Sequence, residues 1–154
     1  MVLKALVPVF LFIAAIAAKA DTLKASPWVS DCEAPYCVFQ KTVEVVDNGT
    51  VFAVVEILIN VEEGSASVVT TAPLGVAIEP GILLLAAGQE RRMTWKVCHP
   101  DGCRATVDLD SAAFAELLQE PAITIRYVAF GADAPVEASL RMDSLITAIS
   151  QARP

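Results

Sequence analysis

Four cysteines in two close pairs constrain the fold of this chain more than any other feature. Each pair, Cys32 with Cys37 and Cys98 with Cys103, encloses four residues that include a proline. Four cysteines allow three connectivities. Because the Pro-Asp-Gly sequence at residues 100–102 is typical of a tight turn, we expect each cysteine to bond to its near neighbour. Closing loops this short stabilises the fold by about 2 kcal/mol each in the chain-entropy description.

Two other uses of four thiols compete with disulfides. A zinc site could take all four cysteines as ligands, because a C-x4-C spacing is just admissible for a zinc knuckle. Thiol–disulfide exchange typically uses a C-x-x-C pair at a helix N-terminus, and neither pair has that spacing. The N-terminal sequence indicates export, as described below, and an exported chain reaches an oxidising space in which disulfides form and persist. We therefore expect no metal site and no cofactor.

The first twenty residues are typical of a cleavable export signal. Lys4 precedes an apolar stretch over residues 5–18, which ends in an Ala-Lys-Ala sequence at residues 18–20. This pattern predicts cleavage between Ala20 and Asp21. A retained membrane anchor is the alternative, but Lys19 interrupts the run before the roughly 20 apolar residues that a span requires. We expect a periplasmic or secreted protein with no membrane span after cleavage.

Residues 1–20 are thus expected to be a signal peptide, and residues 21–154 a single domain. The remaining 134 residues are enough to bury a sizeable core. Nine basic residues then face eighteen acidic ones, which gives a net charge of −9. A surface of this charge repels phosphate backbones and anionic lipids. We expect no nucleic-acid partner.

Strand signals dominate the first half of the mature chain. Residues 38–47 and 50–60 are rich in β-branched side chains, and the Asn-Gly sequence at residues 48–49 favours a type I′ hairpin turn between them. Residues 51–59 are almost continuously apolar, which predicts a central strand covered on both faces. Short strands are expected at 68–71, 74–78 and 82–86.

The second half adds strands and two short helices. Alternating side chains around Trp95 and Ala105 predict a hairpin, and we expect Gly102 to form a bulge that brings these two residues face to face. Asp110 or Ser111 should cap a helix over 112–119. Strands are expected at 123–130 and 136–140, followed by a helix through Ile149 that Asp143 caps. Many short strands joined by hairpins favour a sandwich or barrel.

Catalytic chemistry has little support in the sequence. The only histidine, His99, lies between Cys98 and Pro100 in the predicted turn, and no G-x-S-x-G nucleophile elbow is present. Ser65 and Ser67 read as a polar loop. Arg91 with Arg92 is interpreted as a solvated rim, and Trp28 with Trp95 as core anchors. We assign no catalytic residue, although carboxylates that meet from distant strands would leave no sequence signal.

Four motifs in a fixed order resemble the invasion-associated locus B (IalB) family over nearly the whole mature chain. These motifs are Trp28-Val-Ser-Asp-Cys32, Cys37-Val-Phe-Gln40, Pro73-Leu-Gly-Val76 and Cys98-His-Pro-Asp-Gly-Cys103. The resemblance implies an exported envelope protein of alphaproteobacteria with an immunoglobulin-like antiparallel β-sandwich, in a family named for members linked to host-cell invasion and virulence. It implies the same two local disulfides, with no catalytic residues and no cofactor.

The leading hypothesis is therefore a non-enzymatic envelope or secreted protein. Its partner would be an unknown protein in the envelope or on a host cell. The alternative is a periplasmic chaperone or inhibitor that binds extended peptides along an exposed strand edge. An exposed edge beside an apolar groove would favour that alternative.

Overall fold

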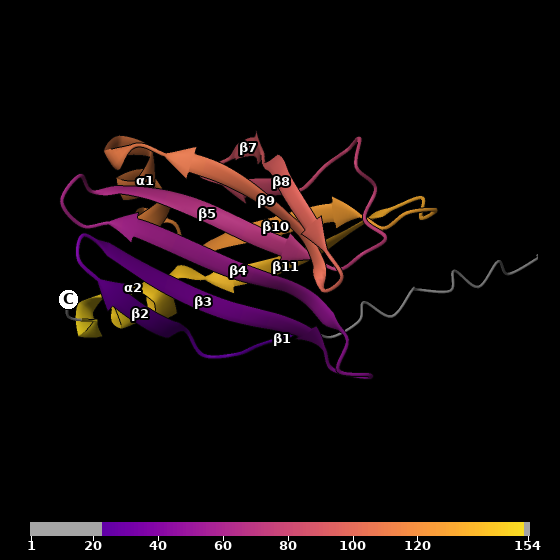
Figure 1. The fold of residues 1–154 in the computed structure, drawn as a ribbon, viewed down its shortest axis with the longest axis horizontal. Coiled ribbons are helices and arrows are strands. Elements are labelled where there is room, and N and C mark those ends of the chain that lie inside the picture. The colour runs from indigo at the N-terminus through magenta and orange to yellow at the C-terminus, as the bar shows by residue number, and fades with distance from the viewer. Residues whose placement is uncertain (1–22, 153–154) are drawn as a thin grey trace, which may run out of the picture.

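The computed structural model describes residues 23–152 as two antiparallel sheets that pack face to face (Figure 1). In the larger sheet the order is β1-β3-β4-β5-β9-β8, and β2 pairs with β3 on the same side as β1. Its strands are β1 (Leu23–Ala25), β2 (Val29–Glu33), β3 (Tyr36–Val45), β4 (Val51–Asn60), β5 (Ser65–Ala72), β8 (Thr94–His99) and β9 (Gly102–Leu109).

The smaller sheet has the order β11-β10-β6-β7. Its strands are β6 (Leu83–Ala86), β7 (Gln89–Arg92), β10 (Ala122–Val128) and β11 (Pro135–Arg141). Helix α1 (Ser111–Gln119) follows β9, and helix α2 (Met142–Gln151) follows β11 directly. Both helices lie at the same end of the sandwich, and α2 contacts β3 and β10 (Figure 1).

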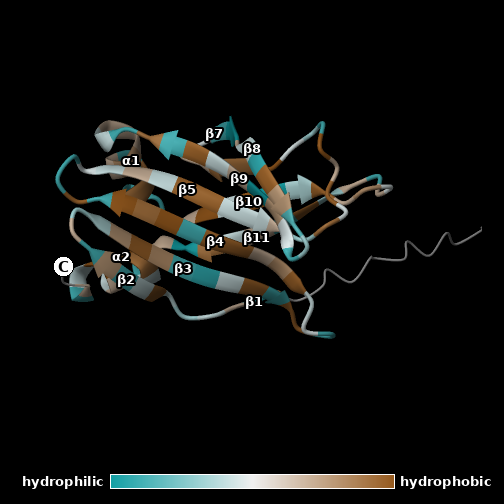
Figure 2. Ribbon diagram, viewed as in Figure 1, coloured by the Kyte–Doolittle hydropathy of each residue, from teal (hydrophilic) through white to brown (hydrophobic). Residues whose placement is uncertain are grey.

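The core lies between the two sheets because apolar side chains alternate along the strands that face each other. Phe39 on β3, Ile57 on β4, Leu84 on β6 and Ile125 on β10 are all fully buried. Figure 2 shows β4 as brown along most of its length, in agreement with its central position. The predicted fold class, a mainly β antiparallel sandwich with two short helices, is confirmed.

The expectation that β4 is covered on both faces is wrong. Phe39, Ile57 and Val55 face the core, but Val54 and Leu58 on the other side of β4 are only half-buried. The second sheet covers one face alone, so the apolar outward residues are shielded by their cross-strand neighbours.

The β3–β4 hairpin is present, but its turn is not the predicted two-residue type. The N–H of Val45 donates to the carbonyl of Thr50, and the N–H of Gly49 donates to the carbonyl of Val45, each at 2.8 Å. Gly49 alone has a positive φ, of 66°, whereas a type I′ turn needs two such residues. The Asn48 side chain instead accepts from the N–H of Thr50, which closes a longer loop.

The register predicted for the β8–β9 hairpin is confirmed, but the bulge lies elsewhere. Trp95 pairs with Ala105, and the extra residue is absorbed between Trp95 and Val97, at Lys96, rather than at Gly102. Gly102 pairs directly with His99 and has a φ of 149°. A side chain on Gly102 would collide with the Ala72 carbonyl of β5. Glycine is therefore required for close strand approach.

Other local predictions have mixed outcomes. Residues 74–78 form a loop with one isolated bridge instead of a strand, and the polar strand β7 was not predicted. Asp110 caps α1 by accepting from the N–H of Ala113 at 2.8 Å, as expected. Asp143 lies in the first turn of α2, and the capping position is Arg141.

Candidate functional site: an apolar cavity at one end of the sandwich

A cavity of about 680 Å³ opens at the end of the sandwich opposite the helices. It lies between the edge strand β1 of the larger sheet and the edge strand β11 of the smaller one. Its walls are mainly apolar, with Leu23, Phe52, Leu74, Val76 and Val136 among them. A cavity of this size falls within the range of ligand pockets.

Two loops are tied together to form the outer wall of the cavity. The N–H of Phe130 donates to the carbonyl of Gly75 at 2.6 Å, and the N–H of Ala77 donates to the carbonyl of Val128 at 2.8 Å. Val76 forms an antiparallel bridge with Ala129 between these bonds. The loop after β5 is therefore fixed to the β10–β11 hairpin, and the cavity has a wall of defined position.

Tyr127 forms part of the cavity lining from β10. Its ring lies 4.9 Å from the ring of Phe52, and its hydroxyl donates to the Phe52 carbonyl at 2.9 Å. Burial raises the pKa of the Tyr127 hydroxyl to about 12. The phenol is thus neutral at physiological pH and already bonded, so it serves as a fixed wall.

Apolar side chains are also exposed around the cavity mouth. Phe130 is 84% exposed at the β10–β11 loop, and Leu74 is 59% exposed on the facing loop. Val46, Val51 and Val136 add further exposed apolar area. We call these five residues the apolar rim. Exposed apolar side chains gathered beside an apolar cavity are typical of an interaction site.

Glu137 is the one charged residue among those that line the cavity. Its carboxylate is paired with Arg126 of β10 at 2.5 Å, so the lining offers no unpaired charge to a ligand. The cavity suits uncharged apolar groups. These could be supplied by apolar side chains of another protein.

A second unusual feature is Lys41, a charged side chain on β3 that is only 7% exposed. Its Nζ lies 3.5 Å from Ser144 Oγ and 5.0 Å from the centroid of the Trp28 ring. Burial lowers the Lys41 pKa, and Asp143 acts in the opposite direction. The Trp28 Nε1–H also donates to Ser144 Oγ, at 3.2 Å. Lys41 thereby joins β3, the segment before β2 and α2.

The Lys41 and Ser144 pair differs from a serine–lysine catalytic dyad. Such a dyad requires the lysine to accept the serine proton. Ser144 Oγ instead donates to the carbonyl of Arg141 at 2.9 Å. The geometry fits a cation–π and hydrogen-bond contact that holds α2 against the sheet.

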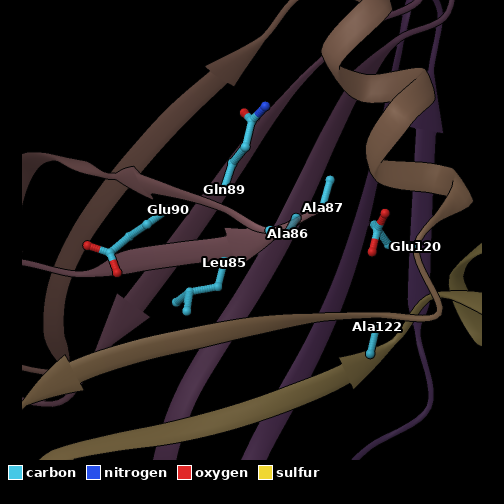
Figure 3. A pocket seen from close by; sticks show the side chains of 8 residues that line it. Leu85, Ala86, Ala87, Gln89, Glu90, Glu120 and Ala122 are labelled. Carbon is cyan, nitrogen blue, oxygen red and sulfur yellow. The ribbon is translucent and has the colours of Figure 1, made fainter.

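A smaller pocket of about 360 Å³ lies beside the β6–β7 turn (Figure 3). Glu90 and Glu120 are its two carboxylates, and Figure 3 shows them on different sides with Ala86 and Ala87 between them. Glu90 also pairs with Arg126 at 3.3 Å. The two acids do not converge, as acid–base catalysis would require.

Comparison with known proteins agrees with this fold. A family model described as Invasion associated locus B (IalB) protein matches residues 26–153. The chain belongs to the IalB family. The crystal structure of invasion associated protein b from Bartonella henselae matches with a TM-score of 0.64 and 18% identity, covering 83% of this chain and 92% of that one. No curated protein matches the sequence.

The cysteines of this IalB family member form two cross-strand disulfides at opposite ends of the larger sheet. Cys32 is bonded to Cys37 across the β2–β3 hairpin, and Cys98 to Cys103 across the β8–β9 hairpin. In both hairpins the bonded residues are direct partners in the register. The predicted cleavage site between Ala20 and Asp21 lies outside the described residues.

The other residues singled out in the sequence do not line the large cavity. His99 is exposed at the end of β8, and Arg92 is exposed on β7. Arg91 donates to the Gln89 side chain at 3.0 Å. Trp28 and Trp95 are partly buried and pack against the core, as expected. Ser67 bonds Asp108 on the outer face of the larger sheet.

The cavity itself was not predicted from the sequence. The Pro73-Leu-Gly-Val76 motif indicates the family and overlaps the strand expected over 74–78, and Phe130, in the loop after β10, falls at the end of the strand expected over 123–130. The signal that was present is a run of small and apolar residues at 129–135 with a single charge. Within residues 23–152, no cluster of three potential metal ligands occurs, and no helix has the length and apolar character needed to cross a membrane.

Proposed function

We propose that this protein is exported, is cleaved before Asp21, and acts outside the cytoplasm through protein contacts rather than catalysis. Two disulfides within one small domain are typical of proteins that fold in an oxidising compartment. The family description and the name of the Bartonella henselae protein both associate this fold with invasion. The proposed setting is therefore the contact between a bacterium and its host cell.

The observation that carries the proposal is the apolar rim around an apolar cavity. Phe130 and Leu74 expose most of their side chains on two loops that are hydrogen-bonded to each other. Exposing such side chains on a fixed surface costs solubility unless a partner covers them. A buried aromatic anchor is the usual centre of a protein interface.

We expect a deletion strain of the producing bacterium to invade host cells poorly and the wild-type gene to restore invasion. A gene carrying both Leu74→Ser and Phe130→Ser should restore invasion to a level about tenfold below that of the wild-type gene, because two central anchors of the contact are lost. The matched control is Ile146→Ser, which removes an exposed apolar side chain from α2, away from the cavity. Colony counts after killing of extracellular bacteria measure the effect.

Two results would contradict this proposal. Normal invasion by the deletion strain would remove the role in invasion. Full restoration by the Leu74→Ser and Phe130→Ser variant would move the contact surface away from the apolar rim. Circular dichroism of the purified variants confirms that each is folded, so that a loss of invasion reports on contact.

A second candidate function is peptide binding as a periplasmic chaperone or inhibitor. The position of β11 beside the apolar cavity favours it, because β11 is an edge strand with no further strand beyond it over residues 23–152. Pairing of a partner strand with a sheet edge is a common mode of peptide recognition. This candidate is distinguished from the first by a deletion phenotype in envelope protein folding rather than in invasion.

A further inference from the structure

We propose that the partner bound at this end is an extended, uncharged apolar segment that pairs with β11 as a fifth strand of the smaller sheet. This inference rests on the proposed function and specifies the chemistry of the partner. Alternate side chains of the segment would enter the cavity beside Val136. The remaining side chains would point outward, next to Glu137.

The direction of the backbone groups of β11 follows from two hydrogen bonds. The N–H of Met142 donates to the carbonyl of Pro121, its partner across the ladder. The hydrogen-bonded pairs between β10 and β11 are therefore every second pair, counted back along β11 from Met142. The carbonyl of Val128 accepts from the N–H of Ala77 and therefore points to the side of β10 away from β11, as this alternation requires. In an antiparallel ladder, the intervening residues direct their N–H and C=O groups away from the neighbouring strand.

Glu137 and Ser139 are such intervening residues on the outer edge of β11. Each therefore presents one N–H and one C=O group to the free side of the strand. Among the described residues, no backbone hydrogen bond from another segment reaches these groups. The carbonyl of Arg141, the next residue in the series, already accepts from Ser144 Oγ. A partner strand would thus pair over residues 135–139.

The cavity lies beside the same stretch of β11. Pro135, Val136 and Glu137 all line it, and Val136 faces inward in step with the buried Ala138 and Leu140. Because side chains alternate along a strand, every second side chain of an added strand would lie on this inward side. The hydrogen-bonding edge and the apolar cavity are therefore placed to recognise one extended segment.

Other occupants fit less well. A second copy paired through its own β11 about a two-fold axis at Ser139 would meet through residues 137–141 alone, because α2 begins at Met142. Such a contact would leave the cavity unfilled. A copy paired about Glu137 would set two Glu137 side chains directly opposite each other, and like charges in that position are destabilising. An acyl chain could fill the cavity but would leave the outward N–H and C=O groups of Glu137 and Ser139 without partners. An uncharged segment with flanking basic residues matches both the lining and the acidic surface.

The test uses a capped heptapeptide in which three valines alternate with two threonines between terminal lysines. Its matched control carries serine in place of each valine. We expect the valine peptide to protect the backbone amides of Glu137 and Ser139 from hydrogen exchange, measured by NMR on the chain from Asp21. The serine peptide should give no protection, because it has nothing to place in the cavity.

Variants of the edge test the backbone contacts. Ser139→Pro removes an outward N–H without breaking the β10 ladder, and we expect at least about tenfold weaker binding of the valine peptide. Ser139→Ala keeps this N–H and should bind within about twofold of wild type. Arg92→Pro places proline at an outward position of β7, on the opposite edge of the same sheet, and should also bind like wild type.

Three outcomes would overturn strand pairing. These are the absence of saturable binding up to about 1 mM peptide, binding without protection of Glu137 and Ser139, and wild-type affinity in folded Ser139→Pro. The proposed function fails separately. If the rim variant loses invasion while the peptide finds no site, the contact surface stands and strand pairing falls. If the peptide pairs with β11 while the deletion strain invades normally, strand pairing stands and the proposed role in invasion falls.

Discussion

Replacing Gly102 with alanine is expected to lower the free energy of unfolding by about 3 kcal/mol. The new Cβ would overlap the carbonyl oxygen of Ala72 and lie 3.0 Å from Cγ2 of Thr71. The φ of 149° at Gly102 is also unfavourable for any L side chain. β9 would have to separate from β5 to relieve the clash, and the ladder between these strands would weaken. Urea denaturation followed by circular dichroism measures the change.

Gly88→Ala is the matched control for Gly102→Ala. Gly88 also has a positive φ, of 68°, but no atom lies within 4 Å of the position its Cβ would take. Its replacement should therefore lower the free energy of unfolding by only about 1 kcal/mol, which is the cost of holding an L residue at a positive φ. Equal losses in the two variants would show that the contact between β9 and β5 is not the reason for glycine at position 102.

Removing both disulfides is expected to lower the free energy of unfolding by about 4 kcal/mol, about 2 kcal/mol for each bond. Each bond closes a loop with a sequence separation of five residues, so the entropy it removes from the unfolded chain is small and similar in the two cases. The variants are Cys32→Ala with Cys37→Ala, Cys98→Ala with Cys103→Ala, and all four together. Urea denaturation of each, beside wild type, gives the loss.

The two losses should be additive. One disulfide lies in the β2–β3 hairpin and the other in the β8–β9 hairpin, on opposite edges and at opposite ends of the larger sheet. Distant sites that share no partner add to within about 0.5 kcal/mol. A fourfold variant that lost much more than the sum would mean that the fold depends cooperatively on the two bonds.

Much of the sandwich could be predicted because its central strands carry strong local signals. β3 and β4 are rich in β-branched residues and meet at Asn48-Gly49, so the hairpin was clear even though its turn type was not. The alternation around Trp95 and Ala105 required one extra residue in the β8–β9 hairpin. The inward and outward alternation of side chains along the two strands could therefore show that a bulge exists. A bulge at Gly102 would bring Trp95 opposite Ala105 only by moving Cys98 off Cys103, whereas Lys96 lies between these two pairs and keeps both in register.

The edges of the sheets and the cavity could not be predicted because they depend on tertiary packing. β7 is the sequence Gln-Glu-Arg-Arg, which pairs with β6 despite its polar character because its side chains lie at a solvent-exposed edge. Lys41 occupies an inward position of β3 that alternation predicts to be apolar. It is tolerated because Trp28 and Ser144, far apart from it in sequence, supply its contacts.

Site-specific photocrosslinking in the producing bacterium during contact with host cells tests the central claim most directly, namely that the partner binds at the apolar rim. A photoreactive phenylalanine derivative would replace Leu74 or Phe130, and Glu116 on α1, at the opposite end of the sandwich, would serve as the control position. We predict one discrete adduct of the same mass from positions 74 and 130 and none from position 116. Equal adducts from all three positions, or none from 74 and 130, would contradict the account.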